Sequence, residues 1–127
     1  MTCKILIVDD SKLARMSVVK ILAAHFPDWP RCEAGSAEEA IKSMKEDAAP
    51  DIALLDYNMP VQNGLDLAVQ LAKLKPSMSI AVISANHQQE VVERAQALGA
   101  FFLPKPISEE ALKNFLAAAV QNLKAAS

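Results

Sequence analysis

Two kinds of apolar segment alternate along this chain. Short apolar runs rich in β-branched residues predict β-strands, and longer stretches with an apolar residue at every third or fourth position predict amphipathic helices. The predicted strands are residues 5–8, 31–34, 52–55, 80–83 and 101–103, and the predicted helices cover about 11–26, a segment opened by residue 36, 65–75, 88–98 and a segment after 108. Two signals mark helix ends: Ser36 with Glu39 forms a capping box, and Gly99 suits a left-handed C-terminal cap.

Regular alternation of strands and helices is typical of a parallel sheet that is covered by helices on both faces. Closing such a sheet into a barrel takes eight strand–helix units, whereas this chain provides five. The sequence therefore predicts a single α/β domain over residues 1–127. We expect an open, doubly wound, five-stranded parallel sheet with five helices on its two faces.

Composition narrows the class of protein. Apolar residues make up 52% of the chain and charged residues 22%, which excludes a disordered chain. The formal net charge is -2, and the absence of a basic run argues against nucleic-acid binding. Asp9 and Asp10 interrupt the first apolar run, which therefore predicts neither a membrane span nor a signal peptide. The two cysteines are too few for a disulfide framework and are expected to be reduced thiols. Together these features predict a cytoplasmic protein.

Polar side chains suited to phosphoryl chemistry follow four of the five predicted strands. Asp9 and Asp10 follow the first strand, Asp56 the third and Ser84 the fourth, and the fifth runs into Lys105. Ligands of open parallel sheets bind at the carboxyl ends of the strands, so we expect these side chains to share one edge. Clustered carboxylates repel one another unless a cation lies among them, and oxygen ligands favour Mg²⁺. A carboxylate beside that ion can be the nucleophile that forms an aspartyl phosphate.

Four segments at these positions resemble the signature segments of receiver domains in two-component response regulators. They are ILIVDDS at 5–11, LLDYNMPVQNG at 54–64, ISA at 83–85 and PKP at 104–106. The resemblance spans the chain in order. It implies the flavodoxin-like strand order 2-1-3-4-5 and a phosphorylation switch in two-component or phosphorelay signal transduction, with the fourth helix, fifth strand and fifth helix as the output face.

The resemblance implies a role for each matching side chain. Asp56 accepts a phosphoryl group from a histidine kinase or a histidine phosphotransfer protein, and Lys105 pairs with the phosphoryl oxygens. Ser84 swings inward to hydrogen-bond one of those oxygens. Phe102 matches the aromatic switch residue of the family, although it has no hydroxyl and would act through packing alone. The resemblance also implies a cis peptide bond between Lys105 and Pro106.

Metal ligands and rate-tuning positions are implied in the same way. The side chains of Asp10 and Asp56 and the backbone carbonyl of Asn58 bind Mg²⁺ (or Mn²⁺), with Asp9 assisting through water. Asn58 and Asn86 occupy the two positions by which the family tunes the loss of the phosphoryl group to water. Because two amides orient water but are poor bases, we expect a slow-to-moderate rate of hydrolysis.

Three other classes of protein fit the residues less well. A magnesium-dependent phosphatase of the haloacid-dehalogenase kind needs a second aspartate two residues after its nucleophile, whereas Asp9 is followed by Asp10 and Ser11. A flavodoxin-like electron carrier needs a hydroxyl- or glycine-rich phosphate loop in that place, and a scaffolding pseudo-receiver would lack site residues. We therefore expect a signalling switch rather than an enzyme. The alternative is a receiver that belongs to a longer response regulator or hybrid kinase.

The predicted partners are the phosphoryl donor and a downstream target protein or output domain, and they include neither nucleic acid nor membrane. The first helix favours a partner surface. Val18 and Leu22 belong to its buried face, yet Leu13, Met16 and Val19 add a second apolar strip. A helix that is apolar beyond one stripe is either deeply buried or offers an interface. The resemblance places donor docking on this helix, so we favour an interface.

Overall fold

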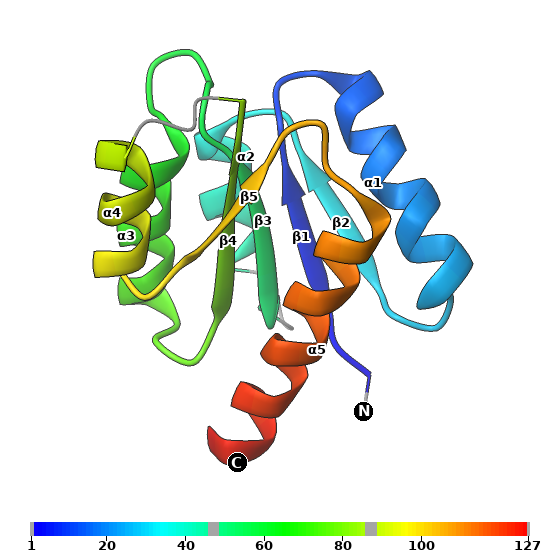
Figure 1. The fold of residues 1–127 in the computed structure, drawn as a ribbon. Helices are drawn as coiled ribbons and strands as arrows, with labels where there is room; N and C mark the ends of the chain where they lie inside the picture. The colour runs from blue at the N-terminus through cyan, green and yellow to red at the C-terminus, as the bar shows by residue number, and fades with distance from the viewer. Residues whose placement is uncertain (1, 46–48, 86–88, 127) are drawn as a thin grey trace.

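The computed structural model describes residues 2–45, 49–85 and 89–126, and its strands form one parallel sheet between two layers of helices (Figure 1). The strands are β1 (Ile5–Val8), β2 (Arg31–Ala34), β3 (Ile52–Asp56), β4 (Ser79–Ser84) and β5 (Phe101–Pro104). The helices are α1 (Lys12–His25), α2 (Ala37–Ser43), α3 (Gly64–Leu74), α4 (Gln89–Ala97) and α5 (Glu109–Ala126). The strand order β2-β1-β3-β4-β5 confirms the predicted doubly wound sheet.

The order of the strands reverses at β1. The chain passes from β1 outward to β2, then returns to the other side of β1 with β3 and continues to β4 and β5. Open parallel sheets bind ligands in the crevice at such a reversal, outside the carboxyl ends of the strands. The register pairs Val8 with Leu55 and Asp56 with Ile83. Residues that follow β1 therefore come to lie beside the last residue of β3.

Two hydrophobic cores lie on the two faces of the sheet. Leu6 and Val8 of β1 pack with residues of α2, α3 and α4, whereas Ile5 and Ile7 pack with residues of α1 and α5. Every residue of β1 and β3 is buried, as expected for central strands covered on both faces. A slip of one residue would move each side chain into the wrong core, so burial fixes the register of the two strands that carry the aspartates.

The helix ends follow the predicted signals with one difference. Ser36 Oγ accepts a hydrogen bond of 3.2 Å from the Glu39 backbone N–H. The Glu39 carboxylate accepts its return bond from the Gly35 backbone N–H, one residue before the position that the capping box predicts. Gly99 has a φ of 78° and lies just past α4, which confirms the left-handed cap. In the described part of the chain, no helix has both the length and the hydropathy that a membrane span requires.

The second apolar strip of α1 is divided between core and surface. Val18 and Leu22 are buried, and Val19 packs half-buried against the same core. Leu13 and Met16 are 76% and 53% exposed. Both lie in the first two turns of α1, directly after the Asp9–Asp10 segment. The exposed part of the strip is therefore available to a partner at the end of the helix that is nearest the aspartates.

Candidate functional site

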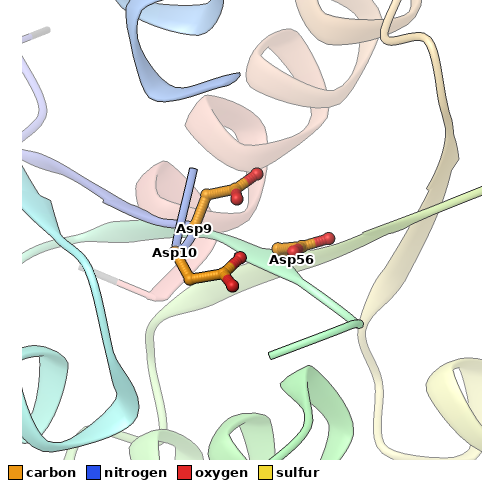
Figure 2. Close-up of side chains that lie close together, drawn as sticks. All are labelled: Asp9, Asp10 and Asp56. Atoms are coloured by element: carbon orange, nitrogen blue, oxygen red, sulfur yellow. The ribbon is translucent and has the colours of Figure 1, made fainter. Parts of the chain in front are cut away.

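Three aspartates converge at the carboxyl edge of the sheet, and their side chains reach into the same space (Figure 2). Asp9 and Asp10 follow β1, and Asp56 is the last residue of β3. One carboxylate oxygen of each lies within 4.8 Å of the other two. Asp9 and Asp56 are buried and Asp10 is exposed, so the cluster is open to solvent on the side of Asp10.

Backbone contacts hold the turn that carries Asp9 and Asp10. The Asp9 N–H donates to the Ala34 carbonyl at 3.1 Å, and Asp9 Oδ1 accepts from the Ser11 N–H at 2.9 Å. Ser11 is the N-cap of α1, and its Oγ accepts from the Ala14 N–H at 3.3 Å. The two aspartates are thus fixed between the end of a buried strand and the start of a capped helix.

Lys105 brings a positive charge to the carboxylates. Its Nζ lies 2.8 Å from Asp56 Oδ1 and 3.7 Å from Asp9 Oδ2. Burial raises the pKa of the Asp56 carboxyl; the nearby Lys105 ammonium opposes this, and the charge of Asp9 adds to it. Burial lowers the pKa of Lys105, but its two carboxylate partners outweigh burial and leave that pKa raised. Lys105 therefore stays charged at neutral pH.

The donor set fits a hard divalent cation. Asp56 Oδ1 is buried and receives no well-directed hydrogen bond from the described residues, although the Lys105 ammonium is close. Three carboxylates share this one ammonium, and a metal ion would relieve the repulsion between them. Oxygen ligands of Mg²⁺ lie about 2.1 Å from the ion and therefore at most about 4.2 Å apart. One carboxylate oxygen from each of the three aspartates lies within 4.8 Å of the other two, so at most a small adjustment brings them to this limit.

The loop between β3 and α3 closes tightly behind Asp56. The Tyr57 N–H donates to the Ile83 carbonyl at 2.8 Å, and the Gly64 N–H donates to the Tyr57 carbonyl at 3.0 Å. A Cβ on Gly64 would lie 2.5 Å from the Asp56 carbonyl oxygen, so no larger residue fits without a shift of the backbone. Val61 in the same loop is fully exposed and has a φ of 70°, a strained conformation for a β-branched residue.

The predicted switch residues Ser84 and Phe102 lie on β4 and β5, and Lys105 lies just beyond β5. Ser84 is fully buried at the end of β4, and its carbonyl accepts from the Lys105 backbone N–H at 3.0 Å. The Lys105–Pro106 peptide bond is cis, which confirms that prediction. Phe102 is half-buried and packs against the core that faces α2, α3 and α4. Ser84 and Lys105 therefore reach the carboxyl edge from neighbouring strands.

Of the two predicted rate-tuning residues, Asn58 and Asn86, the structure describes Asn58. Asn58 is exposed, two residues after Asp56, and its backbone N–H acts to lower the pKa of the Asp56 carboxyl. Asn86 lies outside the described residues. Their predicted effect on phosphoryl loss stays a prediction, as does the predicted bond from the Asn58 carbonyl to a metal ion.

A sequence model of the response regulator receiver domain matches residues 5–117. The chain belongs to this receiver family. Chemotaxis protein CheY of Thermotoga maritima is 36% identical over 104 residues, which cover 81% of this chain and 85% of that protein. Transcriptional regulatory protein PdtaR of Mycobacterium tuberculosis is 35% identical over 106 residues, 83% of this chain and 50% of that protein. The receiver thus spans about half the length of PdtaR.

Solved structures agree with the fold of this receiver. A CheY-like response regulator receiver domain protein from Methanospirillum hungatei superposes with a TM-score of 0.85 at 24% identity, covering 98% of both chains. Receiver domains are generally signalling modules of two-component systems rather than enzymes. They generally bind Mg²⁺ at an acidic pocket, and this chain has a cluster of three aspartates at the carboxyl edge of its sheet.

Two residues of the receiver site were not singled out by the sequence. Gly64 lay within a recognised segment, but its contact with Asp56 depends on how α3 approaches β3. Arg15 lay within a predicted helix and carried no motif. Its guanidinium Nη1 donates to the Asp9 carbonyl at 2.5 Å. The signal for Arg15 was weak: a long basic side chain one turn into the helix that follows two strand-end aspartates.

Proposed function

We propose that residues 1–127 act as one receiver domain that takes a phosphoryl group on Asp56 and changes its partner surface in response. The donor is a histidine kinase or a histidine phosphotransfer protein, and a downstream target protein or output domain reads the change. Donor and receiver share a compartment, which we propose is the cytoplasm. The observation that carries the proposal is the placement of buried Asp56 beside Lys105 and two further aspartates.

In this proposal the Asp56 carboxylate is the nucleophile. One of its oxygens forms a bond to phosphorus while the bond between phosphorus and the imidazole nitrogen of the donor breaks, and that nitrogen keeps the electron pair. Lys105, 2.8 Å from Asp56 Oδ1, is close enough to follow the phosphoryl oxygens and offset their charge. The mixed anhydride that results is open to hydrolysis, which suits a reversible signal.

Asp10, Asp56 and the backbone carbonyl of Asn58 would hold Mg²⁺ (or Mn²⁺), with Asp9 contributing through water. When bound, the ion neutralises charge on the phosphoryl oxygens during transfer. The charge balance supports a divalent ion: three carboxylates and one ammonium leave the cluster with two negative charges. A divalent cation cancels that excess, so the residues that face the ion need no further neutralisation.

The response would pass from β4 to β5. Phosphorylation adds nearly two negative charges and three acceptor oxygens. The Ser84 hydroxyl, at the end of β4, would donate to one of those oxygens. Phe102 lies on the adjacent strand β5, two register positions before the Ser84–Pro104 pair. A shift of Ser84 would change the packing around Phe102. The surface that changes is formed by α4, β5 and α5.

Intact mass spectrometry tests the proposal. The chain is incubated with acetyl phosphate and Mg²⁺ and compared with an EDTA sample, with Asp56→Asn and with Asp51→Asn as a matched change at the other end of β3. We expect one labile phosphoryl group in the wild type and in Asp51→Asn, and none in the EDTA sample or in Asp56→Asn. Labelling that persists in Asp56→Asn would place the acceptor elsewhere. No labelling from acetyl phosphate or from a phosphorylated histidine phosphotransfer domain would contradict the proposal.

We also propose that Asn58 and Asn86 give the phosphoryl group a long or intermediate lifetime. Amide side chains can orient a water molecule but cannot deprotonate it effectively. The decay of the phosphorylated form, followed by mass after removal of the donor, should therefore be faster in Asn86→Glu than in the wild type. An unchanged half-life would remove the role of residue 86.

A further inference from the structure

Arg15 links three elements behind the aspartate cluster. It lies on α1, and only 17% of its side chain is exposed. Its Nη1 donates to the Asp9 backbone carbonyl at 2.5 Å. Its Nε donates to Glu33 Oε1 at 3.1 Å, and Glu33 is on β2. The guanidinium therefore connects the first helix, the second strand and the carboxyl end of the first strand.

The carbonyl that Arg15 binds belongs to the peptide unit between Asp9 and Asp10. That unit joins the two aspartates, so its orientation determines where their carboxylates point relative to Asp56. The other groups of Asp9 are also held: its N–H by Ala34 and its Oδ1 by the Ser11 N–H. Arg15 completes the set of bonds that fix this turn.

Arg15 brings a positive charge close to the proposed cation site, and Glu33 offsets it. An unpaired guanidinium next to a cation site would repel the cation, because like charges at short distance are unfavourable where solvent screening is weak. Glu33 pairs with the guanidinium and offsets that charge. The pair thus offers a hydrogen-bond donor to the Asp9 carbonyl with little net charge of its own.

We propose that Arg15 is a positioning residue for the divalent cation, and that it acts through the Asp9–Asp10 peptide unit while Glu33 orients and neutralises it. The proposal rests on the proposed function, because it assumes that the aspartates bind Mg²⁺. Residues that orient metal ligands from outside the ligand shell typically change metal affinity by 10- to 100-fold when they are replaced. Arg15→Ala should therefore weaken Mg²⁺ binding about tenfold.

Electrostatics alone predicts the opposite sign. Removing a positive charge near the cluster would strengthen Mg²⁺ binding, so a weaker affinity in Arg15→Ala identifies positioning rather than charge. Lys12→Ala is the matched control, because Lys12 is exposed at the start of the same helix and carries the same charge. It should leave Mg²⁺ affinity unchanged or slightly improved. Arg15→Lys keeps the charge and one donor group and should recover part of the affinity.

Glu33→Gln examines the other half of the pair. It leaves the Asp9 contact in place but exposes the cluster to an uncompensated guanidinium, so Mg²⁺ affinity should fall a few-fold. A linkage that only ties α1 to β2 would lower the stability of the protein without this change in affinity. Charge alone also predicts weaker binding in Glu33→Gln, so this variant tests the neutralising role of Glu33. Arg15→Lys keeps the positioning test available if Arg15→Ala fails to fold.

The measurement is Mg²⁺ titration calorimetry on the full chain, with thermal unfolding in EDTA to confirm that each variant is folded. Weaker binding in Arg15→Ala and Glu33→Gln, with unchanged or tighter binding in Lys12→Ala, supports the proposal. Equal or tighter binding in Arg15→Ala overturns it while the proposed function stands. No Mg²⁺ binding by the wild type overturns both, so the two failures are distinguishable.

Discussion

The two ends of β3 each carry an aspartate, and the two carboxylates have different surroundings. Asp51 precedes the strand; its Oδ2 accepts from the Lys4 backbone N–H and its Oδ1 from Lys75 Nζ, both at 3.0 Å. Asp56 ends the strand, close to Lys105 but also to the carboxylates of Asp9 and Asp10. At one end the negative charge is matched by donors, and at the other it is in excess.

This difference separates stability from function within one strand. Lys75 also donates to the Ala49 carbonyl at 3.1 Å, so the amino end of the sheet is held by a small network of satisfied polar groups. The carboxyl end keeps a buried oxygen without a well-directed bond from the described residues. Proteins commonly accept such a local cost where a ligand must bind. The comparison therefore predicts that replacing Asp51 and replacing Asp56 have opposite effects on the free energy of unfolding.

The largest effect is expected from a single methyl group at the carboxyl end. Gly64→Ala would place a Cβ 2.5 Å from the Asp56 carbonyl oxygen, a backbone atom that cannot move aside alone. We expect a loss of about 3 kcal/mol in the free energy of unfolding, together with loss of phosphorylation. Urea unfolding followed by circular dichroism measures the first, and intact mass measures the second.

Gly99→Ala is the control at the amino end of β5. Gly99 has a φ of 78° but no atom within 4 Å of an added Cβ, so the cost is limited to backbone strain of about 1 kcal/mol. Phosphorylation should be retained. Equal losses of stability in the two variants would mean that the close approach of α3 to β3 is not required.

A second prediction compares the two aspartates directly. Asp51→Ala removes the acceptor of two hydrogen bonds and should lower the free energy of unfolding by about 2 kcal/mol. Asp56→Asn removes a buried charge that other carboxylates surround, and should raise it by about 1 kcal/mol in EDTA. Urea unfolding in EDTA provides both values. A loss of stability in Asp56→Asn would show that the ion pair with Lys105 outweighs burial.

The fold could be predicted from the sequence because the signals are local. Apolar runs located each strand to within about one residue at either end. For example, the predicted strand at residues 80–83 lacks only Ser79 and Ser84 of the observed β4. The convergence of Asp9, Asp56 and Lys105 was also predictable, since parallel strands bring their carboxyl ends to one edge.

Contacts between side chains of distant elements could not be predicted in this way. The bonds of Arg15 to Asp9 and Glu33, and of Lys75 to Asp51, depend on how a helix packs against a strand and on which rotamer reaches across. The shift of the Glu39 bond to Gly35 is similar, because the predicted motif specifies spacing but not the path of the side chain. Periodicity contains no information on these distances.

A third prediction adds the ion to the comparison. Because a ligand that binds only the native state stabilises it, Mg²⁺ at ten times its dissociation constant should add about 1.4 kcal/mol to the free energy of unfolding. Asp10→Asn should lose most of this gain with little change in EDTA, since Asp10 is exposed. Asp51→Ala should keep the gain. Thermal unfolding with and without Mg²⁺ decides this, and an equal gain in Asp10→Asn would exclude Asp10 as a ligand.

The smallest effect concerns pH, and its sign follows from the direction of the Asp56 shift. Burial raises the pKa of Asp56 above its ordinary value of 3.8. At pH values between 3.8 and the raised pKa, the native state therefore binds more protons than the unfolded state. The free energy of unfolding must then fall as pH rises through that range. The stability of Asp56→Asn relative to the wild type should therefore increase from mildly acidic to neutral pH in EDTA. Subtracting the two curves cancels the titration of distant groups, and a difference that is flat or decreasing would mean that Asp56 gains more from Lys105 than it loses on burial.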